Sequence, residues 1–251
     1  MTRLFAALIR HGDYQQRPDT PSAHQPYSLN EDGIKQSNQA ADLLDKYIKD
    51  NSLELSPVID SSHLLRAWQT AQIMSDRFTK LNPPNQSNNS NLKNSQLKNN
   101  KLKVESFVAL AERGVGSCVA NLTLSQIEAV IEQDPRLVSP PANWKSNSQY
   151  CLPFPDAESL MIAGERVARH ITEQMEQLRA NSTKDSLKIF VGHGAAFRHA
   201  AYHFGVLDFK MIARLSMYHA SPIYLEYFPD KYWQHSAGEW KVRGESEMSM
   251  D

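Results

Sequence analysis

The sequence predicts a single-domain α/β fold, a three-layer sandwich in which helices cover both faces of a mostly parallel sheet. Short apolar runs alternate with longer helical segments along the chain, an alternation typical of parallel sheets. Residues 4–9 form an uninterrupted apolar run, the pattern of a buried strand. The chain has 251 residues, of which 41% are hydrophobic, so it can bury a sizeable core. Because no boundary is evident, we expect one domain over residues 1–244.

The expected elements follow from these runs and from the polar residues that bound them. Strands are expected where short apolar runs stop, at 4–9, 57–60, 104–110, 187–191 and 223–228. Helices are expected over 31–50, from 61 or 62 to about 78, and over 123–133, 156–179 and 195–204. Asn30, Ser61 or Ser62, and Thr123 are interpreted as N-caps, because their side chains can accept hydrogen bonds from the first free N–H groups of a helix.

Three segments carry no regular pattern. Residues 82–103 are rich in Asn, Ser, Gln and Lys, and we interpret them as a low-complexity surface insertion rather than a partner-binding segment. Residues 135–155 are rich in proline and are expected to be irregular, with Trp144 packed as a cover. Residues 245–251 are expected to form a frayed tail.

The composition excludes several functional classes. The net charge of −1 gives no electrostatic case for nucleic acid or a membrane surface as a partner. The first apolar run is shorter than the core of a signal peptide, and no stretch approaches the ~18 apolar residues of a membrane span. Cys118 and Cys151 form neither a metal-like cluster nor a disulfide framework, although one bridge between them stays possible. We therefore expect a cytoplasmic protein.

Four of the expected strand ends are followed by residues suited to phosphate chemistry. Arg10-His11 follows the first strand, Arg66 comes after the second, Glu112 after the third and His193 after the fourth. The carboxyl ends of the strands form the ligand crevice in open α/β sheets, so we expect these side chains to converge.

Two histidines, two arginines and a carboxylate suit phosphoryl transfer without a metal. A histidine can attack phosphorus as a nucleophile. Arginines neutralise the charge on the phosphoryl oxygens. A carboxyl group can protonate the departing oxygen, and a second histidine can donate to the transferred group.

These residues stand in motifs that resemble the histidine phosphatase superfamily, also called phosphoglycerate-mutase-like, and in particular its phosphatase-type members. The matching segments are Leu8–Gly12, which contains the family's Arg-His-Gly, SSHLLRAWQTA at 61–71, the segment Leu110–Arg113, which contains the acid, and Gly-His-Gly at 192–194. The resemblance implies the phosphoglycerate-mutase-like fold.

The resemblance also implies a role for each site residue. His11 would become a phosphohistidine, and Glu112 would be the general acid and base. The phosphate pocket would consist of Arg10, Arg66, His193 and Ser62. Ser62 is first an N-cap candidate and second a phosphate contact, and Glu105 is the alternative to Glu112.

Other residues have simpler interpretations. His199 and His203 have a metal-compatible spacing, but no third ligand is evident, so we expect no metal and no cofactor. His63 could line the mouth of the pocket or lie at the surface.

The sequence thus leads to one preferred function and two alternatives. The preferred function is a metal-independent phosphomonoesterase that acts on a phosphorylated small molecule or a phosphoprotein through a phosphohistidine on His11. The first alternative is a cofactor-dependent mutase of the phosphoglycerate type. It is weakened because the residues after Glu112 lack the Tyr-Gly-x-Leu pattern and the basic run of such mutases. The second alternative is a non-catalytic phosphate-binding regulatory module.

Overall fold

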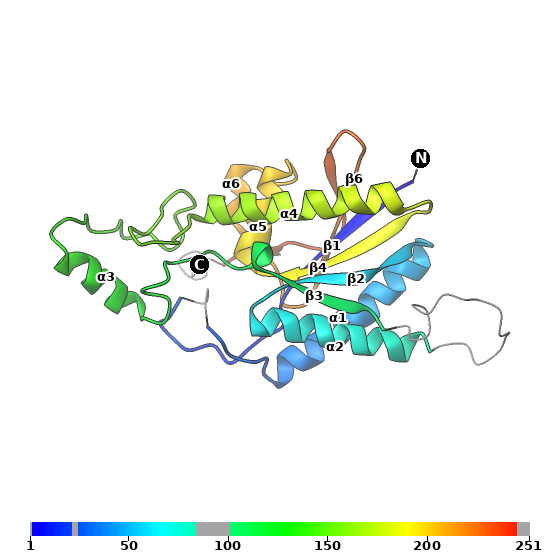
Figure 1. Cartoon of the computed structure of the whole chain (residues 1–251), viewed down its shortest axis with the longest axis horizontal. Coiled ribbons are helices and arrows are strands. Elements are labelled where there is room, and N and C mark those ends of the chain that lie inside the picture. Colours follow the sequence, from blue (N-terminus) through cyan, green and yellow to red (C-terminus); the bar gives the residue numbers. More distant parts are fainter. Residues whose placement is uncertain (1, 22–24, 84–100, 245–251) are drawn as a thin grey trace.

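The centre of the molecule is a six-stranded sheet with the strand order β3-β2-β4-β1-β6-β7 (Figure 1). The computed structural model describes residues 2–21, 25–83 and 101–244. The strands of this sheet are β1 (Leu4–Arg10), β2 (Glu54–Ser62), β3 (Lys103–Phe107), β4 (Ser186–Gly192), β6 (Pro222–Tyr227) and β7 (Trp233–Ala237). β1 to β4 pair in parallel, whereas β6 and β7 are antiparallel. The predicted α/β fold with a mostly parallel sheet is confirmed.

Two pairs of helices cover the sheet, one pair on each face (Figure 1). Helices α1 (Glu31–Asp50) and α2 (Leu65–Leu81) pack on one face. Helices α4 (Leu160–Asn181) and α5 (Gly194–His203) pack on the other. The remaining elements are α3 (Leu124–Gln133), the short α6 (Phe209–Ile212), a 3-10 turn at Val108–Leu110, and a two-stranded sheet of β5 (Leu215–Ser216) and β8 (Lys241–Val242).

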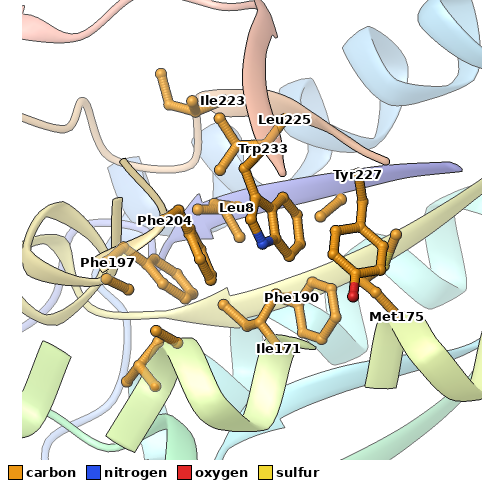
Figure 2. Close-up of a cluster of buried hydrophobic side chains, with 14 of the residues drawn as sticks. Leu8, Ile171, Met175, Phe190, Phe197, Phe204, Ile223, Leu225, Tyr227 and Trp233 are labelled. Carbon is orange, nitrogen blue, oxygen red and sulfur yellow. The ribbon is translucent and has the colours of Figure 1, made fainter. Parts of the chain in front are cut away.

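Strand β1 is buried on both faces, which explains its uninterrupted apolar sequence. Its alternate side chains Leu4, Ala6 and Leu8 belong to the hydrophobic cluster beneath α4 and α5. Figure 2 shows Leu8 in this cluster among aromatic side chains such as Phe190 and Phe197. The intervening side chains face α1 and α2. Full burial of one such large aliphatic side chain stabilises the fold by about 1.5–3 kcal/mol.

The strand register brings two expected site residues together. β1 and β4 pair in parallel, with Arg10 opposite Gly192. The backbone N–H of His11 donates to Gly192 O at 2.9 Å, which continues the ladder by one residue. His11 and His193 therefore emerge side by side where the two central strands end.

Several helix boundaries agree with the expected caps, and one does not. The Asn30 side chain accepts from Gly33 N, and Thr123 forms a capping box with Gln126. The N-cap expected at Ser61 or Ser62 is wrong, because both residues still belong to β2 and pair with neighbouring strands. Helix α2 begins at Leu65 without a side-chain cap.

The third and fourth predicted strand–helix units also differ in their bounds. The strand expected to reach residue 110 ends at Phe107, and the 3-10 turn follows. Helix α4 begins at Leu160 rather than at Asp156, because Asp156 has a positive φ of 63° and Ser159 caps the helix.

A small separate cluster forms a cap beside the carboxyl end of the sheet. It combines α3 with the proline-rich segment, and its buried residues are Val115, Val119, Ile127, Ile131, Trp144 and Leu152. Trp144 is buried as predicted, and its indole N–H donates to Glu128 Oε1 at 2.9 Å. We call residues 115–157 the cap segment.

Some sequence predictions fall on residues outside the described part of the chain. Residues 84–100 of the expected insertion and the tail 245–251 lie there. Within the described residues, no helix combines the length and the apolar character that crossing a membrane requires. Cys118 and Cys151 are both free thiols.

Candidate active site

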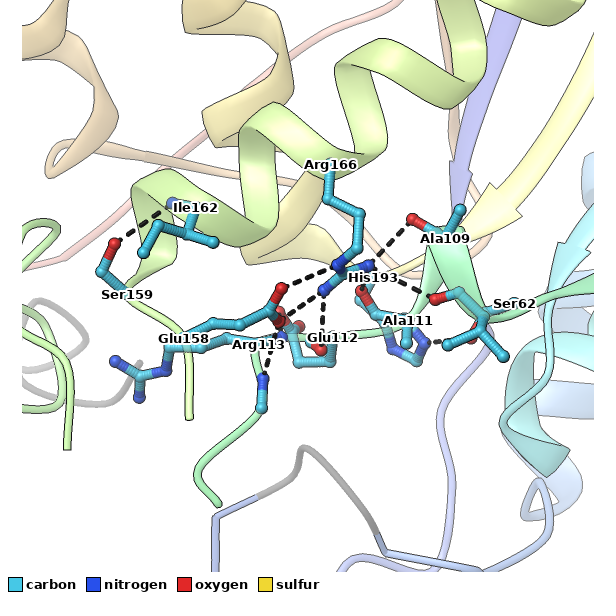
Figure 3. Close-up of polar contacts among 12 residues, drawn as sticks. Ser62, Ala109, Ala111, Glu112, Arg113, Glu158, Ser159, Ile162, Arg166 and His193 are labelled. Carbon is cyan, nitrogen blue, oxygen red and sulfur yellow. Dashed lines mark hydrogen bonds and ion pairs between the residues drawn. The ribbon is translucent and has the colours of Figure 1, made fainter. Parts of the chain in front are cut away.

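The expected site residues converge at the carboxyl end of the parallel strands. Arg10 ends β1 and His11 follows it, Ser62 ends β2, and His193 follows β4. Arg66 lies in the first turn of α2, and Glu112 lies in the loop after the 3-10 turn. Figure 3 shows Glu112, Ser62 and His193 in the same region of the structure.

The hydrogen bonds of His11 determine which of its ring nitrogens carries the lone pair. Arg66 Nε lies 3.1 Å from His11 Nε2. Because a guanidinium group can only donate, Nε2 accepts and is unprotonated. The other nitrogen, Nδ1, donates to Gly12 O at 2.8 Å. The arrangement leaves His11 a neutral imidazole whose Nε2 carries the lone pair.

The tautomer of His193 follows from the same arginine. Arg66 Nη2 donates to His193 Nδ1 at 3.2 Å, so the proton lies on Nε2. That Nε2–H donates to Ser62 Oγ at 2.9 Å. The rings of His11 and His193 lie 5.1 Å apart between centroids.

The electrostatics of the site agree with these assignments. Burial is the main cause that lowers the pKa of His11 well below its ordinary value, and the charge of Arg66 lowers it further. The same two causes, in the same order, lower the pKa of His193. Both imidazoles are therefore neutral at physiological pH, and His11 keeps its lone pair.

Positive charge and backbone donors gather around His11. Arg66 is fully buried, with its guanidinium 4.7 Å from the centre of the Tyr14 ring and its Nη1 donating to Gln25 O at 3.1 Å. Arg10 donates through Nη1 to Met217 O at 3.0 Å. The N-terminus of α5, which has no side-chain cap, adds the positive end of a helix dipole. The charges and donors suit an anion.

A cavity of about 140 Å³ lies over His11. Arg10, His11 and Glu112 line it together with Gly194 and Ala195 at the start of α5. The cap segment contributes Val115, Trp144 and Lys145 to the wall. Arg66, Ser62 and His193 are buried behind this lining and do not themselves line the cavity.

The two carboxylates considered for the acid role occupy different places. Glu112 lines the cavity, and its Oε1 accepts from the backbone N–H of Arg113 at 3.0 Å. Glu105 lies within β3 and pairs with Lys103 Nζ at 2.5 Å. Only Glu112 of these two shares the cavity with His11.

Two further residues near His11 were not predicted from the sequence. Thr70 Oγ1 accepts from Gly12 N at 3.0 Å and donates to Arg66 O at 2.8 Å, which ties α2 to the residue after His11. His219 Nδ1 donates to His11 O at 3.0 Å. Burial, with a smaller effect from Arg10, lowers the pKa of His219 to about 4. Thr70 lies inside the quoted SSHLLRAWQTA motif, whereas His219 lies in an irregular link that carries no sequence signal.

The remaining histidines have other surroundings. His199 is held between Ser148 Oγ at 3.0 Å and Ala195 O at 2.8 Å. Among residues 2–21, 25–83 and 101–244, no group of three or more potential ligands is placed to hold a metal ion. His63 is exposed, in agreement with the surface interpretation.

Comparisons with known proteins agree with the sequence motifs and with the fold. Residues 6–87 match the family profile described as histidine phosphatase superfamily (branch 1). No curated protein matches the chain as a sequence relative.

Solved structures of the same fold extend the comparison over nearly the whole chain. A mycobacterial glucosyl-3-phosphoglycerate phosphatase superposes with a TM-score of 0.63 at 19% identity, covering 96% of this chain and 97% of that protein. The alpha-ribazole phosphatase of Shigella flexneri gives 0.62 at 20% identity, covering 97% and 98%. A phosphoglycerate mutase from Bacillus anthracis gives 0.63 at 16% identity, covering 99% and 96%. At these identities the likeness concerns the fold.

Proposed function

We propose that this chain, a relative of the histidine phosphatases by its profile match and its fold, is a metal-independent phosphomonoesterase that works through a phosphohistidine on His11. One observation carries the proposal. His11 Nε2 has its lone pair free of a proton, and the carboxyl group of Glu112 lines the same cavity. A nucleophile and a proton donor on one cavity are what a two-step transfer requires.

In the first step His11 Nε2 attacks the phosphorus of a bound phosphomonoester. The N–P bond forms while the bond between phosphorus and the ester oxygen breaks. Glu112, protonated at this stage, transfers its proton to the departing oxygen, so the product leaves as an alcohol or phenol. The Nδ1–H bond to Gly12 O holds the ring in orientation and stabilises the positive charge that develops on it.

In the second step water hydrolyses the phosphohistidine. Glu112, now a carboxylate, accepts a proton from the attacking water, and the N–P bond breaks. Inorganic phosphate leaves, and both His11 and Glu112 return to their starting protonation states. The two steps together consume one ester and one water and need no metal or cofactor.

The charge of the transferred group would be balanced by side chains already gathered at the site. Arg10 lines the cavity, and Arg66 would exchange its contact with His11 Nε2 for the phosphoryl oxygens. His193 and Ser62 hold a hydrogen bond next to this position and supply further donors. The N-terminus of α5 adds backbone donors.

The size and the wall of the cavity also bear on the class of substrate. Its volume of about 140 Å³ and its wall formed by the cap segment favour a small phosphorylated molecule over a phosphoprotein. Two of the structural neighbours are named as phosphatases of glucosyl-3-phosphoglycerate and alpha-ribazole phosphate, which are small molecules. We also propose that the protein works in a reducing compartment such as the cytoplasm, which its two free thiols support.

The test compares phosphate release from p-nitrophenyl phosphate by the wild type and by His11→Ala, with a chelator present. We expect the wild type to turn over and the variant to lose roughly 10⁴-fold or more, because the nucleophile is absent. His235→Ala is the matched control, since His235 is exposed on the edge strand β7 and does not line the cavity.

Each other outcome has a definite meaning. Near-normal turnover in His11→Ala would refute the phosphohistidine route, and an activity that the chelator removes and metal restores would refute the metal-free scheme. If the wild type is inactive, a mutase assay with bisphosphoglycerate decides between the mutase and the non-catalytic phosphate-binding module.

A further inference from the structure

The loop that carries Glu112 is held by one arginine from the neighbouring helix. Arg166, in the second turn of α4, reaches the acid loop, which we define as residues 108–114 (Figure 3). Its Nη1 donates to Ala109 O at 2.8 Å and to Ala111 O at 3.2 Å. Its Nη2 donates to Glu112 O at 3.4 Å. The guanidinium group thus contacts the backbone just before Glu112 and at Glu112 itself.

Glu158 completes the same arrangement from the other side. Its carboxylate pairs with Arg166 in the bidentate manner, with Nε to Oε1 at 2.8 Å and Nη2 to Oε2 at 2.6 Å. The same Oε2 accepts from Gly114 N at 3.1 Å, and the Glu158 N–H donates to Gly114 O at 2.8 Å. The pair Arg166 and Glu158 therefore binds the acid loop along its whole length, and we call it the loop clamp.

The chemistry of the clamp depends on the shape of its two side chains. Only a planar guanidinium can donate to a carboxylate along one edge and to several carbonyl groups along the others, so a lysine could keep only part of these bonds. The side chains of Arg166 and Glu158 are only 24% and 20% exposed, which strengthens the pair relative to a surface ion pair. Neither residue lines the cavity.

We propose that Arg166 and Glu158 are positioning residues that hold the carboxyl group of Glu112 where it can protonate the leaving oxygen. The inference rests on the proposed function, because it assigns the acid role to Glu112. The regular structure of the loop ends with the 3-10 turn at Leu110, so the backbone at Glu112 depends on contacts of this kind rather than on a helix or strand ladder. A misplaced catalytic group can lose on the order of 10²-fold in rate.

The test uses two aryl phosphates whose leaving groups differ in how much they depend on protonation by a general acid. Phenyl phosphate has a poor leaving group, and p-nitrophenyl phosphate has a good one of similar size. We compare kcat/KM, which reports the steps up to phosphoryl transfer and excludes hydrolysis of the phosphohistidine. Arg166→Ala should lower kcat/KM for phenyl phosphate by roughly 10- to 100-fold but for p-nitrophenyl phosphate by less than about 3-fold.

A double-variant cycle with Glu112→Gln shows whether Arg166 affects the rate through Glu112. Glu112→Gln alone should show the same dependence on the leaving group. Adding Arg166→Ala to Glu112→Gln should cost little more, because both changes remove one proton transfer. Arg166→Lys and Glu158→Gln, which keep more of the packing, should give intermediate losses with the same dependence.

Arg169→Ala is the matched control. Arg169 lies on the same helix, pairs with Glu165 at 3.6 Å, and is 67% exposed. Its removal should leave both kcat/KM values unchanged, and thermal unfolding of every variant shows whether the fold persists. If Arg166→Ala does not fold, Arg166→Lys and Glu158→Gln carry the test.

Two outcomes would overturn the inference while leaving the proposed function intact. Equal losses for both substrates would show a merely structural role for the clamp, and full additivity with Glu112→Gln would show that it acts elsewhere. A failure of the proposed function itself would appear separately, as turnover that survives in His11→Ala.

Discussion

Arg66 fixes the protonation states of both histidines at the site. It donates to Nε2 of His11 and to Nδ1 of His193, and it cannot accept. The sequence resemblance implied only a phosphate ligand at this position. The structure adds that burial, and after it the charge of the same arginine, lowers the pKa of His11 and so keeps its imidazole neutral.

Removing the charge of Arg66 should raise the pKa of His11. In Arg66→Met the imidazolium no longer faces a cation, so its protonated form becomes less unfavourable, although burial still keeps the pKa low. The pKa can be followed by NMR of the imidazole nitrogens. Arg66→Lys retains the positive charge and should raise the pKa less. An unchanged pKa in Arg66→Met, or an equal rise in both variants, would contradict this account.

At the residue scale, the sequence identified most readily the site residues that belong to a local motif. Arg10, His11 and His193 could be named because each lies at the end of a buried strand or directly after it. His219 could not, since it approaches His11 only through the fold, from a link between β5 and β6. A contact of that kind leaves no local pattern in the sequence.

At the scale of elements, the contact between α4 and α5 connects the two halves of the site. α5 begins beside His193, and α4 carries Arg166 of the loop clamp. The helices approach closely at Gly164, where an added Cβ would lie 2.4 Å from the Cβ of His199 and 2.7 Å from its backbone carbonyl carbon. A side chain at this position requires the helices to separate.

Gly164→Ala should therefore destabilise the protein, by about 1–3 kcal/mol for an overpacked site. The sign of the change in unfolding free energy is informative, because replacing Gly by Ala at an exposed helical position stabilises a protein by up to about 1 kcal/mol. Urea unfolding measures the difference. Glu165→Ala, at the exposed neighbouring position, serves as the control and should stay within about 0.5 kcal/mol of the wild type. A stabilised Gly164→Ala would show that the helix contact is looser than described.

The sequence predicted the strands whose burial shows in their residues and missed those that only pairing with a neighbouring strand defines. β1 and β4 are buried on both faces, so their apolar runs are visible without the structure. β7 was missed because its residues are mostly exposed and polar, and only pairing with β6 defines it. The serines at the end of β2 were misassigned because a polar residue before a helix resembles a cap, whereas strand pairing decides their conformation.

The molecule as a whole holds three histidines neutral in or beside the site, and this couples its stability to pH. The pKa of His11 and of His193 lies well below the ordinary value of 6.5, mainly through burial, and that of His219 is lowered to about 4. In the unfolded chain the same groups regain the ordinary value. Below pH 6.5 the unfolded state therefore binds more protons than the folded state, and unfolding becomes easier.

Stability measured by urea unfolding should fall steadily from pH 6.5 to 4.5. Each of these histidines contributes up to about 1.4 kcal/mol per pH unit while its unfolded form is protonated and its folded form is not. The His219→Gln variant should show a shallower slope, because it removes one such group and keeps a donor at that position. A stability that is constant or rises over this range would contradict the assignment of neutral histidines.

The position of β1 has a consequence for how the protein acquires its activity. This strand comes first in the chain, yet it lies inside the sheet between β4 and β6, which come from the last third. Contacts between residues so distant in sequence close large loops and form slowly. His11 and His193 meet only when β4 has docked on β1. Recovery of turnover during refolding would therefore report the docking of these late strands on β1.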